Sequence, residues 1–162
     1  MIKQTDPQTG PVIAKFGCYL FSLLYKVEKR TGVVFDWPHI QAIYLAGIQA
    51  GVIGPETYGA DGVPTGGCFV NDTPALLHLA GAGNATMESG PLDAEMFPVG
   101  LGLASGDEAI QEWNNPATGF NHFVCGNPDG SVEWDPIEYP DGSGSVTVRD
   151  GHQVAWRVLN FA

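Results

Sequence analysis

A cysteine lies at the start of an amphipathic segment, FGCYLFSLLYKVEKR, where Cys18 directly follows Gly17. The N-terminus of a helix offers unpaired N–H groups and a positive dipole end, which favour a thiolate and can hold an oxyanion. This position therefore suits a nucleophile that attacks carbonyl carbons. Most lone cysteines are instead small buried hydrophobes, and that alternative stays open. Against it, Cys18 lies off the apolar stripe formed by Phe16, Leu20, Leu23 and Val27.

A nucleophilic thiol needs a base, and the chain contains four histidines. His39 and His78 lie in apolar helical patterns and His152 lies in a turn, so we expect these three to be packed or surface residues. His122 lies in FNHFVCG, a predicted strand that would hold the ring rigidly against a helix terminus. The alternative for His122 is a half-buried strand histidine without a catalytic role.

An acid that orients the histidine is found in the next predicted strand, where Asp135 belongs to SVEWDPI. If the turn NPDG closes with Asn127 opposite Gly130, the register places His122 directly across from Asp135 on one face. A three-residue loop with a bulge at Gly130 would instead turn Asp135 to the other face, unless a second bulge corrects it. The alternative for Asp135 is a strand-end turn residue.

The other cysteines are predicted to pack rather than react. Cys125 lies three residues after His122 and should face the core, and Cys68 lies among apolar neighbours in CFVND. Three widely spaced cysteines indicate neither a disulfide framework nor a CxxC zinc site. A zinc set of Cys18, His122 and Asp135 lacks any short-spaced ligand pair, so we expect no metal and no cofactor.

The composition bounds the class of protein. At 162 residues the chain is predicted to form one domain, residues 1–162, with 44% apolar residues, 22 glycines and 12 prolines typical of a loop-rich globular fold. A formal net charge of −11 disfavours nucleic acid and anionic membrane surfaces as partners. No apolar run approaches the ~20 residues of a membrane span, and the polar start MIKQTDPQTG predicts a cytoplasmic protein.

Helices are predicted mainly in the N-terminal half. Hydrophobic periodicity and capping residues indicate helices over 16–30, over 37–50 with Asp36 as the cap, and over 73–79 with Asp72 or Thr73 as the cap. Another helix is predicted over 105–113, because Ser105 and Glu108 have capping-box spacing.

The remaining segments are predicted to be loops and strands. Residues 51–67 are rich in Gly and Pro and read as a long surface loop. Residues 82–104 give no clear pattern beyond a possible strand over 95–99. From Gly119 onward, the segments FNHFVCG, SVEWDPI, SVTVR and VAWRVLNF predict an antiparallel sheet.

The order of these elements resembles the papain-like cysteine peptidase superfamily, in the compact form of the bacteriocin-leader (double-glycine) peptidases. It is most similar to phage and spirochaete-plasmid proteins with a GCY-type helix and HFV…DP strands. GCYLFSLLY resembles the nucleophile helix, NHFVCGN the histidine strand and VEWDPI the acid strand; residues 31–118 match only loosely. The resemblance implies a papain-like α+β fold in which an N-terminal nucleophile helix packs on a C-terminal antiparallel sheet. It also implies Cys18 as nucleophile, His122 as general base and acid, and Asp135 as orienter.

The sequence departs from the family at one position. Papain-like peptidases usually carry a glutamine about six residues before the cysteine to complete the oxyanion hole, and Val12 stands there. Gln8 and Gln4 lie farther upstream and would have to reach back if the N-terminal segment folds over the site. Asn121 is another oxyanion candidate.

The resemblance implies a cysteine-dependent hydrolase or transferase of amide or peptide bonds, with a peptide or protein as substrate and no cofactor. By the same analogy the protein is a phage-encoded factor that modifies its host from the host cytoplasm. The alternative is a catalytically silent papain-like domain that acts as a protein-binding module or a virion component.

Overall fold

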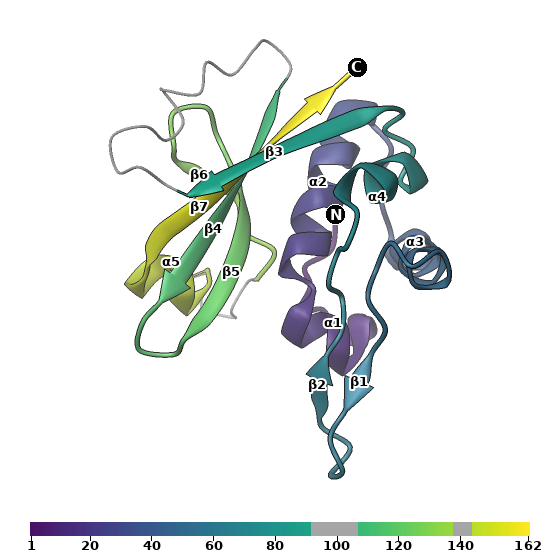
Figure 1. Ribbon diagram of the computed structural model, residues 1–162, viewed down its shortest axis with the longest axis vertical. Helices are drawn as coiled ribbons and strands as arrows, with labels where there is room; N and C mark the ends of the chain where they lie inside the picture. Colours follow the sequence, from purple (N-terminus) through teal and green to yellow (C-terminus); the bar gives the residue numbers. More distant parts are fainter. Residues whose placement is uncertain (92–106, 138–143) are drawn as a thin grey trace.

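The computed structural model describes residues 1–91, 107–137 and 144–162, and it shows an α+β fold with a group of helices beside an antiparallel sheet (Figure 1). The sheet has five strands in the order β3-β7-β4-β5-β6. Their bounds are β3 Ala85–Pro91, β4 Glu108–Asn115, β5 Phe120–Gly126, β6 Val132–Trp134 and β7 His152–Phe161. The strand expected over 95–99 lies outside the described residues.

Four helices form the other group: α1 Gly10–Phe16, α2 Cys18–Thr31, α3 Trp37–Gln49 and α4 Thr73–Leu79. The predicted caps are confirmed. Asp36 Oδ1 accepts a hydrogen bond from the His39 N–H, and Asp72 Oδ1 accepts one from the Ala75 N–H. A short 3₁₀ helix, η1 Pro7–Thr9, precedes α1.

The predicted helix over 16–30 begins two residues later, because Gly17 separates α1 from α2. The Gly17 N–H donates to the Ile13 carbonyl, and a Cβ atom at Gly17 would lie 2.6 Å from that same oxygen. Glycine is therefore required by the close approach of Ile13. The break leaves Cys18 as the first residue of α2.

Helix α2 is the centre of the molecule and packs on β5. Its apolar face is buried through Leu20, Phe21, Leu23, Leu24 and Val27. Polar contacts fix it to the strand as well: Ser22 Oγ donates to the Phe123 carbonyl at 3.1 Å, and Cys125 Sγ donates to the Ser22 carbonyl at 3.3 Å. The start of α2 is thus held at a defined position relative to β5.

A buried lysine adds a charged connection between α2 and the sheet. Lys26 is fully buried, and its ammonium lies 2.7 Å from Glu108 Oε2 and 2.5 Å from Glu133 Oε2. It also donates to the Gly126 carbonyl at 3.1 Å. Each of the three N–H donors of the Lys26 ammonium therefore has one acceptor, and these acceptors lie on β4, β5 and β6.

The helix predicted over 105–113 is wrong in the part that the structure describes. Residues from Glu108 onward form β4, a central strand that pairs with β5 on one side and β7 on the other. Ile110 and Gln111 are fully buried there. Backbone pairing on both edges outweighs the local helix signal, which Ser105 and Glu108 supplied.

The strand predicted over SVTVR is also wrong, because this segment forms the short helix α5 Val146–Asp150. Ser145 Oγ accepts from the Val148 N–H and caps it. The β-branched composition indicated a strand, but both edges of β7 are already paired, with β3 and β4. The local cap decides the conformation instead.

Two further segments differ from the expected pattern. The predicted loop over 51–67 contains a small antiparallel pair, β1 Thr57–Tyr58 and β2 Pro64–Gly66. Strand β3 was not predicted. None of the described helices combines the length and the apolar character that a membrane crossing requires.

Candidate active site

His122 and Asp135 meet as predicted, but through a different register. The Asn127 N–H bonds to the Ser131 carbonyl, so the turn is a three-residue loop, and a bulge near Gly126 then places Cys125 opposite Trp134. The structure therefore has the second register that the sequence left open, a three-residue loop with a second bulge, and not the simple turn with Asn127 opposite Gly130. The Gly130 carbonyl instead accepts a hydrogen bond from the Gln111 side chain at 2.7 Å.

Asp135 reaches the histidine because it lies just beyond the end of β6. Its Oδ1 is 2.7 Å from His122 Nε2. Backbone N–H groups hold the carboxylate in place, Ile137 donating to Oδ1 at 2.9 Å and Ser145 to Oδ2 at 3.1 Å. A carboxylate only accepts hydrogen bonds, so Nε2 carries the proton and Nδ1 is left for a second partner.

Cys18 is the neighbour on the other side of the site, because its side chain raises the pKa of the His122 ring. The thiol is partly exposed at the first residue of α2, while His122 is buried. The structure therefore brings together Cys18, His122 and Asp135, the three residues predicted from the sequence.

The electrostatics favour a charged imidazole. Burial opposes the positive charge, but the hydrogen bonds with Asp135 and Cys18 outweigh burial and raise the pKa of His122 to about 9. Burial also opposes the charge on Asp135. The hydrogen bonds from His122, Ile137 and Ser145 outweigh it and hold the pKa of this carboxyl below its ordinary value. The site thus supports an imidazolium held by the Asp135 carboxylate.

The other two thiols are buried, as predicted. Cys68 is 2% exposed, and burial raises its pKa to about 12. Burial likewise raises the pKa of Cys125, which is fully buried against α2. Both therefore stay protonated near neutral pH, and Cys18 is the one described cysteine with an accessible sulfur.

The remaining histidines lie at the surface. His39, His78 and His152 are exposed, and His39 contacts only its neighbouring cap Asp36. Among the described residues, no cluster of His, Cys, Asp and Glu has the arrangement of a metal site.

The start of α2 offers backbone donors for an oxyanion. The Phe21 N–H bonds to the Gly17 carbonyl, which leaves the N–H groups of the first residues, including Cys18, without intrahelical acceptors. One of these donors belongs to Cys18 itself, and the others follow directly after it in α2. A tetrahedral oxyanion formed at Cys18 would be close to them.

Gln8 and Val12 do not contribute to this site. Gln8 is exposed and its side chain donates to Asp6 at 3.1 Å, while Val12, at the usual position of the family glutamine, is buried in the core. The structure therefore gives no support to Gln8 as an oxyanion donor.

Gln4 is the upstream glutamine that the fold brings in. Its side chain is buried and donates to the Ala14 carbonyl at 3.0 Å, at the junction that leads into Gly17 and Cys18. Its backbone N–H donates to the Pro136 carbonyl, next to Asp135. Its Oε1 atom is buried and has no hydrogen-bond partner among the residues that the structure describes. Gln4 thus connects the nucleophile end with the acid segment, and sequence spacing gave no reason to prefer it over Gln8.

Lys3 is a second contribution of the N-terminal segment that the sequence did not suggest. Its ammonium donates to the Asp135 carbonyl at 2.6 Å and lies 4.4 Å from the centre of the Trp134 ring. Residues 3 and 4 together hold the segment around Asp135 from outside the sheet.

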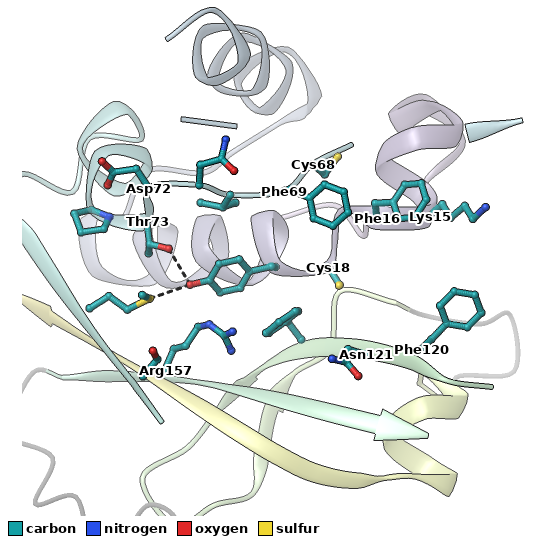
Figure 2. A pocket seen from close by; sticks show the side chains of 17 residues that line it. Lys15, Phe16, Cys18, Cys68, Phe69, Asp72, Thr73, Phe120, Asn121 and Arg157 are labelled. Atoms are coloured by element: carbon teal, nitrogen blue, oxygen red, sulfur yellow. Dashed lines mark hydrogen bonds between the residues drawn. The ribbon is translucent and has the colours of Figure 1, made fainter. Parts of the chain in front are cut away.

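A cavity of about 660 Å³ opens beside Cys18, between the helices and the sheet (Figure 2). Asn121 lines it from β5, so this oxyanion candidate does lie near the nucleophile. Its side chain is already engaged, however, donating to Glu112 Oε1 at 2.8 Å and accepting from Asn114 at 2.7 Å. Asn121 therefore has one N–H left for a ligand.

Comparisons with protein-family models, with curated protein sequences and with solved structures found no match to this chain. The function is therefore inferred from the residues of the site.

Proposed function

We propose that the protein is a cysteine-dependent hydrolase or transferase of amide or peptide bonds, built as a compact papain-like domain. The observation that carries this proposal is the position of His122, which lies 2.7 Å from Asp135 and whose pKa the neighbouring Cys18 side chain raises. A cysteine, a base and an orienting acid in contact are the parts that nucleophilic catalysis by a thiol requires.

In the proposed reaction, the Cys18 thiolate attacks the carbonyl carbon of the amide and forms a tetrahedral oxyanion. The N–H groups at the start of α2 stabilise that oxyanion. The C–N bond then breaks, and the His122 imidazolium protonates the departing amine, which leaves a thioester on Cys18. Asp135 keeps the ring oriented and stabilises its positive charge before the transfer.

Water or a second amine completes the cycle. Neutral His122 takes a proton from the incoming water or amine as it attacks the thioester carbon. The carbon–sulfur bond breaks, and Cys18 and His122 return to their starting forms. Water yields a carboxylic acid and an amine yields a new amide, which is why both hydrolase and transferase remain within the proposal.

The arrangement of elements supports the papain-like part of the proposal. The nucleophile begins a helix from the N-terminal half, the histidine lies on a strand of an antiparallel sheet, and the acid follows the next strand (Figure 1). The same order carried the resemblance seen in the sequence. A phage-encoded factor that acts in the host cytoplasm is the biological role that this resemblance favours.

The test is the rate of Cys18 alkylation by iodoacetamide as a function of pH, followed by intact mass and peptide mapping. We expect Cys18 to react well below pH 8 and His122→Ala to slow the reaction at neutral pH, because the imidazolium stabilises the thiolate. Cys68 and Cys125 are buried and should remain unmodified in the folded protein. An unchanged rate in His122→Ala would contradict the proposal.

A catalytically silent papain-like domain is the second candidate, and the burial of Val12 at the usual glutamine position favours it. Such a domain would use the cavity to bind a protein partner or to act in a virion. It predicts that Cys18→Ala leaves the biological function intact. Loss of function in Cys18→Ala, with folding retained, would exclude this alternative.

A further inference from the structure

The cavity beside Cys18 has an unusually exposed aromatic lining. Phe69 and Phe120 are each 62% exposed, although large apolar side chains are normally covered. Both line the cavity together with Cys18. An exposed apolar patch at a concave site indicates a surface that another molecule covers.

The two phenylalanines come from opposite sides of the cavity. Phe69 follows Cys68 in the segment that leads into α4, and its ring lies 6.2 Å from the ring of Phe16 at the end of α1. Phe120 begins β5, two residues before His122. Figure 2 shows Cys18 between the Phe16 and Phe69 pair and the strand that carries Phe120. A side chain seated there would touch aromatic surface on both sides and lie next to the sulfur.

One cation at this end of the cavity is available for a ligand. Of the two basic residues in the lining, Arg157 is paired with Glu112 at 2.9 Å. Lys15 makes no ion pair within the described part of the chain; its ammonium donates to the Pro64 carbonyl and lies 5.1 Å from the Phe16 ring centre. The net charge of −11 does not prevent an acidic ligand from binding here, because charges beyond about 8 Å are largely screened at physiological salt.

We infer that the preferred substrate is a peptide with a large apolar side chain, aromatic or aliphatic, next to the scissile amide and an acidic residue nearby. The apolar side chain occupies the space between Phe69 and Phe120, and the carboxylate pairs with Lys15. This inference rests on the proposed function, since it describes the substrate of the same site.

The test is digestion of a mixed peptide library by the full-length protein, with cleavage sites read by mass spectrometry. We expect large apolar residues to be favoured over glycine by about tenfold or more beside the cleaved bond, from the apolar surface that they bury. Phe69→Ala and Phe120→Ala should each reduce that preference severalfold. Tyr58→Ala is the matched control: this half-exposed aromatic residue of β1 does not line the cavity, and its loss should change nothing.

The charge is tested with Lys15→Glu, which should replace the preference for acidic neighbours by one for lysine and arginine. Protection of the buried Cys68 and Cys125 from alkylation confirms that each variant is folded. Two outcomes overturn the inference and leave the proposed function standing: cleavage without an apolar preference, and an apolar preference that survives in both phenylalanine variants. The same holds for a charge preference that Lys15→Glu leaves unchanged. If the wild-type protein cleaves no peptide, the proposed function fails and the inference fails with it.

Discussion

His122 Nε2 lies 2.7 Å from Asp135 Oδ1, although the two residues are not a cross-strand pair of the β5–β6 hairpin. The contact depends on the carboxylate turning back just after β6, where the Ile137 and Ser145 N–H groups fix both of its oxygens. The acid is therefore preorganised by the backbone before a substrate binds.

Removing the charge of Asp135 should impair catalysis more than folding. Asp135→Asn retains the shape but no longer fixes the imidazole tautomer, so we expect kcat to fall by roughly 10²- to 10⁴-fold. The measurement is peptide cleavage under saturating substrate. Asp129→Asn, an exposed carboxylate of the β5–β6 turn, is the matched control and should stay within about twofold of wild type. Full activity in Asp135→Asn would contradict the role of this residue.

The stability of the protein should decline on the alkaline side of neutrality. Because the pKa of His122 is raised from 6.5 to about 9, its charge stabilises the folded state fully below pH 6.5, and this contribution is lost as pH rises to about 9. At about 1.4 kcal/mol per pH unit, the loss is roughly 3 kcal/mol.

Urea unfolding at pH 6 and pH 9.5 measures this effect. His122→Gln removes the titrating group and should show a smaller difference between the two pH values. Asp135 contributes in the opposite sense. Because its pKa is lowered, its negative charge stabilises the folded state at pH values above 3.8, the ordinary pKa of the carboxyl, and this contribution is lost as the pH falls further. An equal alkaline loss in wild type and His122→Gln would exclude the proposed coupling.

The two upstream glutamines give a direct comparison. Gln4→Ala should lower kcat/KM by about tenfold or more, because Gln4 supports the α1–α2 junction beside the N–H groups that bind the oxyanion. Gln8→Ala should have no measurable effect, since Gln8 is exposed. Circular dichroism and the protection of Cys68 and Cys125 from alkylation verify that both variants are folded. Equal activities in the two variants would show that Gln4 does not support the oxyanion site.

The buried ammonium of Lys26 should matter for folding. Lys26→Ala leaves Glu108 and Glu133 without their buried partner and should destabilise the protein by about 3–5 kcal/mol. Lys29→Ala removes a partly exposed lysine that contacts the same two glutamates, and it should cost less than about 1 kcal/mol. Denaturant midpoints provide the comparison, and similar losses in both variants would contradict the account.

The site residues were predictable because each one has a local signal. Cys18 follows a glycine before an apolar helix, His122 lies in an alternating strand, and Asp135 follows a turn motif. The sequence left two registers open for the meeting of His122 and Asp135 and gave no reason to choose between them, since the Gln111 side chain from a neighbouring strand holds the loop. Tertiary hydrogen bonds of this kind leave no mark in the local sequence.

The errors in secondary structure have the same origin. Residues from Glu108 carry a helix-capping signal, but sheet pairing on both sides holds them in β4. The segment from Val146 carries a strand composition, but Ser145 caps it as a helix. The burial of Gln4 likewise depends on the return of residues 1–9 toward Pro136, a contact between the two ends of the chain.

The central claim is that Cys18 and His122 are electrostatically coupled, and titration of the His122 ring by ¹⁵N NMR tests it most directly. In the wild-type protein we expect His122 to titrate near pH 9. In Cys18→Ala, which removes a neighbour that raises the pKa of the ring, the midpoint should move clearly toward the ordinary value. A midpoint near 6.5 in the wild type, or one that Cys18→Ala leaves in place, would contradict the account.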